Sequence, residues 1–129
     1  MNTENADGTD VVLKEVVQAV AWVTINRPQA MNALTPAMLE KLKADIGSLG
    51  SNAAVRVIVL TGAGKAFSAG VDIKALGDIQ ISHGGVGGVL DEPARSLIAT
   101  IREVPQPVIA MINGYCFTGA LELALACDF

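Results

Sequence analysis

The stretch PVIAMINGYCFTGALELALAC, Pro107–Cys127, decides the fold class of this chain. It opens with Val108–Ile112, an apolar run with the length and composition of a strand that is buried on both faces. Asn113-Gly114 then predicts a turn, and Gly119–Cys127 is apolar enough to form a buried helix with one carboxylate in it. A strand that passes through a glycine-bearing turn into a helix is typical of α/β proteins.

Before this stretch the sequence predicts a hairpin, a helix and a further strand. Val11–Val17 and Val20–Ile25 are β-branched runs joined by Gln18-Ala19, which indicates a hairpin. Thr35-Pro36 supplies an N-cap residue followed by a proline at the first helical position. The helix that follows has apolar residues at three- and four-residue spacing, at Met38, Leu39, Leu42, Ile46 and Leu49. Val55–Leu60 is then a nearly continuous β-branched run, which indicates a strand.

The middle of the chain is less regular. Lys65–Leu76 predicts a turn and a short helical piece, and Gly77–Val89 is glycine-rich without periodicity, so we expect a mobile loop there. Helical spacing returns over Asp91–Val104, and the prolines that follow end that helix. Asp128-Phe129 resembles the opening of another strand, so we expect the sequence to be cut between elements of one fold.

Composition excludes several classes of protein. Hydrophobic residues make up 51% and charged residues 17% of the chain, against a usual charged share of about 25%. General disorder is therefore excluded, and we expect partner subunits or further chain to cover the apolar surface. A net charge of −4 gives no basic field for nucleic acid. Met1–Asp10 lacks the regions of a signal peptide, and no apolar run has the length of a membrane span, so we expect a cytoplasmic protein without a membrane partner.

The sequence offers no set of metal ligands. Cys116 and Cys127 lack the paired spacing of a zinc site or redox motif, and we expect buried, reduced thiols. His83 is a lone histidine in a polar loop, which favours a solvated side chain over a general base. We expect neither a metal nor a separate cofactor.

Two glycine-bearing turns are the candidate site. In sheets with parallel crossovers, functional groups collect in the turns after the carboxyl ends of strands, here Ala66–Asp72 and Asn113–Ala120. Each turn precedes a helix, where main-chain N–H groups lack internal partners. Two such donors directed at one point form an oxyanion hole, which stabilises a carbonyl oxygen that gains negative charge in a transition state. A glycine before a helix is also commonly only a cap, so neither turn decides the matter alone.

Glu122 is the candidate catalytic side chain. It lies three residues after Gly119, one helical turn along nearly the same face. Its neighbours are apolar, and a carboxyl group enclosed by them would be suited to move protons to and from carbon or water. The alternative is a solvated glutamate on an amphipathic helix.

Four blocks of sequence resemble the enoyl-CoA hydratase/isomerase family, the crotonase superfamily. They span nearly all of Val11–Phe129 and are Thr24–Pro28 with Met31–Leu34, Val57–Gly62, Lys65–Ile73, and Pro107–Ala110 continued by Asn113–Tyr115 and Gly119–Ala124. The resemblance implies an α/β fold, a spiral of ββα units that is incomplete at the C-terminus, with this chain as the N-terminal half of a typical member. Residues 1–10 would be a flexible segment, and residues 11–129 the N-terminal part of the core domain.

The resemblance also implies a set of functional residues. The family acts on acyl-CoA thioesters, with coenzyme A (CoA) carried as part of the substrate. The N–H groups of Val71 and Gly119 would hold the thioester oxygen, and Glu122 would be the first of two glutamates that activate water. The CoA moiety would lie along Ala30, Ala69, Val71, Asp72, Ile73 and Lys74. Asp72 would also suit an N-cap, and Lys74 a plain surface position.

Two departures from the family pattern stand out. Many relatives have three consecutive glycines where this chain has Thr118-Gly119-Ala120, which crowds the donor glycine with a hydroxyl and a methyl group. The family's second catalytic carboxylate would fall after Phe129. We therefore expect the 129 residues alone to bind CoA poorly and to react slowly.

The leading expectation is an enoyl-CoA hydratase, which adds water syn across the double bond of a 2-enoyl-CoA while the two N–H groups stabilise the enolate. The alternatives within the superfamily are an isomerase, a dehalogenase or a thioester hydrolase. From a different class, the chain would be a non-catalytic assembly or CoA-binding module. The resemblance implies a homo-oligomer, a trimer or a hexamer, for the full-length form.

Overall fold

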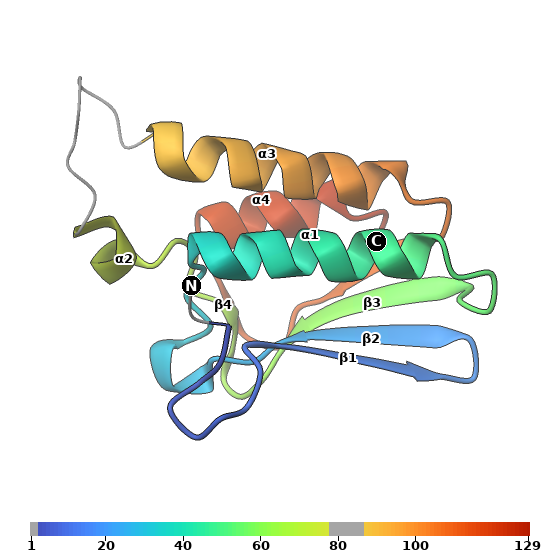
Figure 1. Cartoon of the computed structure of the whole chain (residues 1–129), viewed down its shortest axis with the longest axis horizontal. Helices are drawn as coiled ribbons and strands as arrows, with labels where there is room; N and C mark the ends of the chain where they lie inside the picture. Colours follow the sequence, from blue (N-terminus) through green and yellow to red (C-terminus); the bar gives the residue numbers. More distant parts are fainter. Residues whose placement is uncertain (1–2, 78–86) are drawn as a thin grey trace.

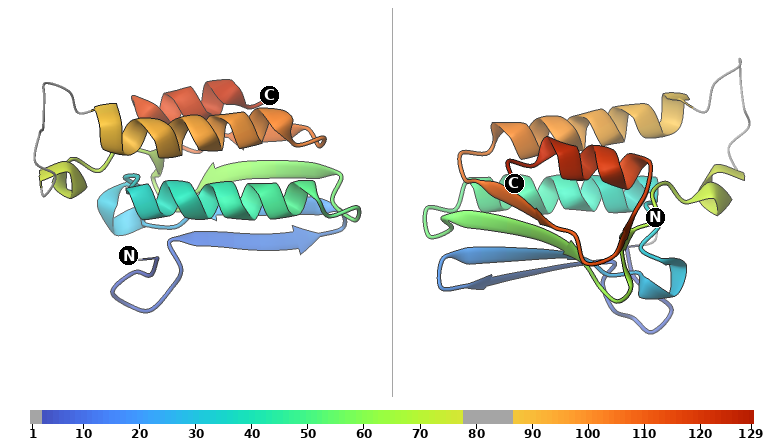
Figure 2. Two further views of the ribbon diagram at one scale, coloured as in Figure 1. Left: turned by 45° about the horizontal axis from the view of Figure 1, so that its top comes forward. Right: turned by 180° about the vertical axis from the view of Figure 1, so that it is seen from behind.

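The computed structural model describes residues 3–77 and 87–129, the latter with backbone only at residues 87–91, as it is at residues 76 and 77. One four-stranded sheet of order β1-β2-β3-β5 carries helices on one face (Figure 1). Helix α1, Pro36–Gly50, lies on the sheet, and α3, Gly87–Glu103, lies against α1. Figure 2 shows the same layering from two further directions. The predicted α/β class is confirmed.

The predicted hairpin is confirmed, and it forms one edge of the sheet. Strand β1, Val12–Val17, pairs antiparallel with β2, Val20–Ile25. Gln18 and Ala19 between them have φ angles of 48° and 69°. Two consecutive left-handed residues give the turn whose twist matches that of the strands, although glycine and asparagine are the usual residues there.

Helix α1 begins and packs as its sequence predicts. The Thr35 hydroxyl accepts a hydrogen bond from the Met38 N–H at 3.2 Å, and Pro36 occupies the first helical position. All five residues of the apolar stripe are buried. The next strand, β3, spans Val57–Gly62 rather than the predicted Val55–Leu60. It starts later because Val55 still belongs to the preceding turn, where its N–H donates to Asn52 O at 3.0 Å.

A second, two-stranded sheet was not predicted. Strand β4, Ala66–Ser68, pairs in parallel with β6, Tyr115–Cys116. The prediction of a turn and a short helical piece over Lys65–Leu76 was therefore incomplete, since a strand precedes helix α2, Ile73–Gly77. Strands of two and three residues are too short to show a period of two, which explains the miss.

Helix α3 begins at Gly87, four residues before the predicted start at Asp91, with Pro93 inside it. The sequence did not indicate a helix there, because glycine at the start and proline in the second turn both have low helix propensity. The predicted loop Gly77–Val89 was thus too long, because its ends belong to α2 and α3. Residues 78–86 of that loop, with His83, lie outside the described residues.

The sheet is completed by β5, Val108–Met111, which is parallel to β3 as β3 is to β2. The chain then passes through β6 into α4, Gly119–Ala126. After α4, Phe129 accepts a hydrogen bond from Ala110 N–H at 2.8 Å, so the chain turns back beside β5 as an opening strand would.

Two short segments flank the site region. A 3₁₀ turn spans Pro28–Ala30. Residues 3–10, predicted to be flexible, form a turn that is fastened to it: Asn5 Nδ2 donates to Asn26 O at 2.7 Å, and Gln29 Nε2 donates to Asn5 Oδ1 at 2.7 Å. The mobility of this segment stays a prediction.

The expected surplus of apolar surface is present, and most of it follows β5, β6 and α4, with smaller contributions from β1 and α2. Large hydrophobic side chains are exposed along β5, β6 and α4, at Met111, Ile112, Tyr115, Phe117, Leu121, Leu125 and Phe129. Among the residues that the structure describes, no helix is long and apolar enough to cross a membrane.

Candidate active site

The pairing of β4 with β6 brings the two predicted turns together. Phe117 N–H donates to Ser68 O at 3.2 Å. A Cβ atom placed on Gly70 would overlap the hydroxyl of Thr118, and one placed on Gly119 would lie 3.5 Å from Val71 Cγ2. The turns predicted from separate parts of the sequence are therefore in contact.

The direction of the first predicted donor, the Val71 N–H, follows from its peptide plane. Leu34 N–H donates to Gly70 O at 2.7 Å, and Asp72 N–H donates to Leu34 O at 2.9 Å. The peptide is trans, so its N–H points opposite to its carbonyl. The Val71 N–H thus points away from Leu34, and no hydrogen bond within residues 3–77 and 87–129 uses it.

The second predicted donor, the Gly119 N–H, is directed by its peptide plane in the same way. Thr118 O accepts from Glu122 N–H at 3.2 Å, along the direction of α4. The Gly119 N–H therefore points off the N-terminus of that helix, and it has no acceptor among the described residues. Neither predicted donor therefore has an acceptor among the described residues. In each case the carbonyl of the same peptide group is hydrogen-bonded within the protein, which fixes the direction of the N–H.

Thr118 occupies a conformation that favours glycine. Its φ and ψ are 48° and −115°, and Ala120 N–H donates to Phe117 O at 3.0 Å across the turn. A β-branched residue rarely adopts such angles, and the cost is about 1–3 kcal/mol. The Thr118 hydroxyl lies against Gly70 of the first turn, while the crowding of Gly119 that the sequence suggests stays a prediction.

Glu122 is exposed, which corrects the expectation of an apolar enclosure. Helix α4 buries only Ala120 and Leu123, while Leu121 and Leu125 beside Glu122 are 46% and 75% exposed. The sequence suggested burial because the whole helix is apolar. Within the described residues, α4 contacts the rest of the protein through one face only, and Glu122 lies on a different face of the helix.

Asp72 is the N-cap of α2, as one of the two predictions for it stated. Its Oδ1 accepts from Lys74 N–H at 2.9 Å and Ala75 N–H at 3.3 Å, and its Oδ2 pairs with Arg27 Nη1 at 2.5 Å. Desolvation raises the pKa of Asp72, but the Arg27 hydrogen bond, the two N–H groups and the Arg27 charge together hold that pKa below its usual value. Asp72 is therefore charged at neutral pH.

The residues predicted to lie along CoA gather near the first turn. Ala69 N–H donates to Met31 O at 2.9 Å, which joins the Ala30 region to that turn. Ile73 is 80% exposed, and Lys74 is exposed as well. Their contact with CoA stays a prediction.

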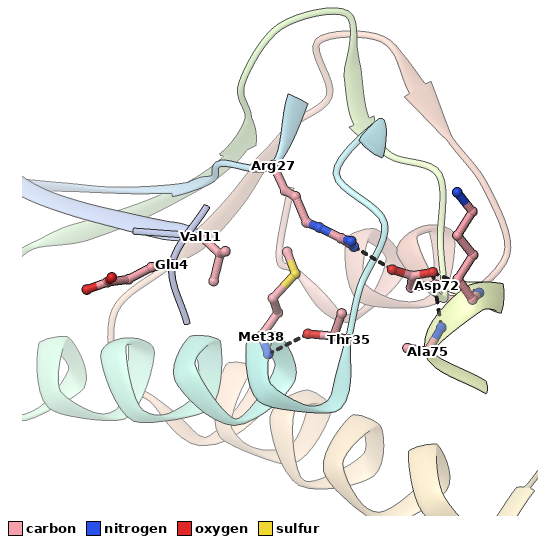
Figure 3. Close-up of a pocket in the computed structure, with 8 residues that line it drawn as sticks. Glu4, Val11, Arg27, Thr35, Met38, Asp72 and Ala75 are labelled. Carbon is pink, nitrogen blue, oxygen red and sulfur yellow. Dashed lines mark hydrogen bonds and ion pairs between the residues drawn. The ribbon is translucent and has the colours of Figure 1, made fainter. Parts of the chain in front are cut away.

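A pocket of about 280 Å³ opens beside the same region (Figure 3). Its lining includes Arg27, Thr35, Met38, Asp72 and Lys74. The residues that line it do not include Val71, Gly119 or Glu122, so the pocket is separate from the predicted donors.

Two asparagines near the site were not predicted from the sequence: Asn32 is buried, and Asn113 is exposed. Asn32 is fully buried; its Nδ2 donates to Ala63 O at 2.9 Å and Ala66 O at 2.8 Å, and its Oδ1 accepts from Arg27 N–H at 2.8 Å. Asn113 Nδ2 donates to Ala66 O at 3.1 Å from the other side. A polar residue inside an apolar block is the signal that could have marked both.

The cysteines show no sign of reactivity. Cys116 and Cys127 are free and half-buried. Burial raises the pKa of Cys116, and burial with the nearby Asp128 charge raises the pKa of Cys127 to about 11. No group of histidine, cysteine, aspartate or glutamate side chains within the described part of the chain could hold a metal ion.

Comparison with known proteins agrees with the resemblance. A family profile described as enoyl-CoA hydratase/isomerase matches residues 15–129. The short-chain-enoyl-CoA hydratase of Clostridium acetobutylicum is 36% identical over 118 residues, 91% of this chain and 44% of that protein. The peroxisomal Δ(3,5)-Δ(2,4)-dienoyl-CoA isomerase of Arabidopsis thaliana is 34% identical over 137 residues, 99% of this chain and 49% of that protein.

The fold of solved structures matches as well. The crystal structure of an enoyl-CoA hydratase/carnithine racemase from Magnetospirillum magneticum superposes with a TM-score of 0.86 and 37% identity. The match covers 95% of this chain and 46% of that one. The chain thus spans less than half the length of these similar proteins, and the crotonase-like fold that they share is incomplete at its C-terminal end here.

Proposed function

This chain belongs to the enoyl-CoA hydratase/isomerase family, and from that premise we propose that the whole protein is an enoyl-CoA hydratase. It adds water syn across the 2,3 double bond of a 2-enoyl-CoA thioester. The Val71 and Gly119 N–H groups bind the thioester oxygen, which gains negative charge as the enolate forms.

One observation carries this proposal. Two unoccupied main-chain donors come from turns that are in contact, and each donor's direction is set by a carbonyl bonded elsewhere in the protein. Donors fixed in advance need no rearrangement as charge develops on the oxygen. Removing one donor from such a pair typically costs about 3 kcal/mol of transition-state stabilisation.

Glu122 activates the water in this proposal. It belongs to the first turn of α4, the helix that begins at the donor Gly119. Its exposure leaves it open to solvent water and to substrate. A second carboxylate after Phe129, implied by the family resemblance, would share the proton transfers.

The remaining expectations complete the proposal. The CoA moiety lies along Ala30, Ala69, Val71, Asp72, Ile73 and Lys74, no separate cofactor takes part, and the full-length form is a trimer or hexamer. The exposed apolar side chains of β5, β6 and α4 support association with further protein surface. The cytoplasm is the proposed location, although the Arabidopsis relative is named as peroxisomal.

Two other classes of function are possible for the same fold: other reactions of the superfamily, and binding without catalysis. An isomerase is favoured by the dienoyl-CoA isomerase among the similar proteins, since double-bond migration uses the same enolate; a dehalogenase or thioester hydrolase would share the hole in the same way. A non-catalytic CoA-binding or assembly module is favoured by the large apolar side chains exposed on β5, β6 and α4, which are suited to contact further protein.

The test is the turnover of crotonyl-CoA, followed by loss of the absorbance of the conjugated thioester. It is run on this chain and on a version extended past Phe129, each with and without Glu122→Gln. We expect turnover in the extended version and a loss of about 100-fold or more with Glu122→Gln, because the amide cannot take up a proton.

Glu40→Gln is the matched control, because Glu40 is an exposed glutamate on α1. It should leave turnover unchanged. Undiminished turnover with Glu122→Gln would remove the role given to that residue. Substantial turnover by the 129 residues alone would show that the C-terminal half of a typical member is not required for hydration.

A further inference from the structure

Ser68 is a buried polar residue that the proposed reaction does not use. It is the last residue of β4 and is 0% exposed. Its hydroxyl donates to Asn32 O at 2.7 Å and accepts from Gly70 N–H at 3.0 Å. One hydroxyl group therefore links a buried asparagine to the glycine that precedes the Val71 donor.

Gly70 is the weak point in the positioning of that donor. Its φ of 93° is one that glycine adopts readily and other residues do not. The same freedom means that glycine has little preference of its own for this conformation. The direction of the Val71 N–H, one bond further along, therefore depends on contacts made by both ends of Gly70.

Those contacts are two hydrogen bonds. The Gly70 N–H is held by the Ser68 hydroxyl, and the Gly70 carbonyl is held by Leu34 N–H at 2.7 Å. With both ends fixed, the rotation of the next peptide plane is fixed too. Loss of the Ser68 hydroxyl would free one end and leave a buried N–H without a partner.

The acceptor behind Ser68 is itself immobilised. Asn32 has a φ of 57°, is 0% exposed and makes three side-chain hydrogen bonds, to Arg27 N–H, Ala63 O and Ala66 O. Its carbonyl oxygen is thus a fixed point for the Ser68 hydroxyl. The connection runs from Asn32 through Ser68 and Gly70 to the Val71 N–H.

We propose that Ser68 is a positioning residue, which sets the direction of the Val71 N–H through Gly70 while Asn32 holds the Ser68 hydroxyl. The effect of Ser68 on the direction of the Val71 N–H rests on hydrogen bonds within this chain. The consequence for rate rests on the proposed function, in which that N–H binds the thioester oxygen. Ser68 touches no substrate; it acts only through Gly70.

The geometric part is tested by NMR on the full 129-residue chain. The residual dipolar coupling of the Val71 N–H reports the orientation of that bond, and Ser68→Ala should change it while couplings in α1 and β3 stay the same. Ser68→Cys, which retains a weak donor and acceptor, should give a smaller change and provides a second variant if Ser68→Ala fails to fold. An unchanged Val71 coupling in a folded variant overturns the proposal.

The kinetic part is tested in the extended version with crotonyl-CoA. Ser68→Ala should lower kcat by about 10- to 100-fold with KM within about threefold, because a misplaced donor weakens transition-state binding more than substrate binding. The infrared carbonyl stretch of the bound thioester should also shift toward its value in water. A purely structural role for Ser68 would not move that stretch.

Thr35→Ala is the matched control, since it removes one hydroxyl that bonds to a main-chain N–H at the start of α1. It should lower stability without changing kcat or the carbonyl stretch. Equal kcat losses in the two variants would overturn the role of Ser68. If the unsubstituted protein shows no turnover, the proposed function fails, and the Val71 coupling still decides whether Ser68 positions the N–H.

Discussion

The two turns that meet at the candidate site are built in opposite ways. Around the first turn, Asn32, Ser68 and Asp72 are buried and hydrogen-bonded. Around the second, Tyr115 and Phe117 are stacked on each other but more than half exposed. The first donor is thus fixed by polar contacts inside the chain, while the second stands at an apolar surface.

The two turns therefore differ in how much of their support comes from the described residues. Satisfied buried polar groups give a unique geometry, so the first turn is complete within the described residues. The second turn has a strained residue, Thr118, and few covering side chains. Substitutions in the first turn should therefore cost stability, and matched substitutions in the second should cost much less.

The largest expected effect is that of Asn32→Ala. It removes three hydrogen bonds and leaves buried carbonyls and an N–H without partners, so we expect a loss of about 3–4 kcal/mol in the free energy of unfolding. The matched variant Asn113→Ala, at an exposed residue, should cost about 1 kcal/mol. Urea unfolding measures both, and equal losses would erase the contrast between the turns.

The eight-residue helix α4 contains one buried and one exposed leucine, so the same contrast can be tested within a single element. Leu123 is 2% exposed and Leu125 is 75% exposed. Leu123→Ala should lower the free energy of unfolding by about 2–3 kcal/mol, because it leaves a cavity, and Leu125→Ala by less than about 0.5 kcal/mol. A comparable loss at Leu125, seen in the urea midpoint, would mean that further protein already covers this face in solution.

Asp72→Asn should cost about 1–2 kcal/mol at pH 7, since it discharges the pair with Arg27. The folded pKa of Asp72 lies below its unfolded value of 3.8, so its contribution is present above pH 3.8 and lost as the pH falls through the folded pKa. The stability difference between the two proteins should therefore shrink in acid. Urea midpoints between pH 7 and pH 3 test this, with Glu40→Gln as the exposed control.

The smallest effect has the opposite sign. Thr118→Gly should raise the free energy of unfolding by about 1 kcal/mol, because relief of the strained φ exceeds the entropy that glycine adds to the unfolded chain. Ala120→Gly, two residues on and inside the helix, should instead lower it by about 1 kcal/mol. A thermal melt distinguishes the two signs, and destabilisation by Thr118→Gly would show that the threonine contributes more contact than strain.

The long elements with a clear apolar period were predictable from the sequence, whereas the two short strands and their pairing were not. The stripe on α1 repeats over 15 residues, so its buried face could be named in advance. Strands β4 and β6 consist of three and two residues, below the length at which alternation can be seen. Their pairing, which joins the two turns, therefore had to come from the structure.

The residues of the site divide in the same way. The two glycine-bearing turns could be named because turns before helices leave N–H groups free, and the family resemblance pointed to Val71 and Gly119 within them. Asn32 could not, because its partners are main-chain carbonyls more than 30 residues away in sequence and carry no signature of their own. The environment of Glu122 was mispredicted, since composition shows that a helix is apolar but not which side the rest of the protein covers.

The trans peptides before Val71 and Gly119 present main-chain donors, which few amino-acid substitutions can remove. Their N–H groups are main-chain atoms, so no inherited side-chain replacement deletes them except a change to proline. Substitutions at positions 71, 118 and 120 therefore retain both N–H groups, unless position 71 becomes proline.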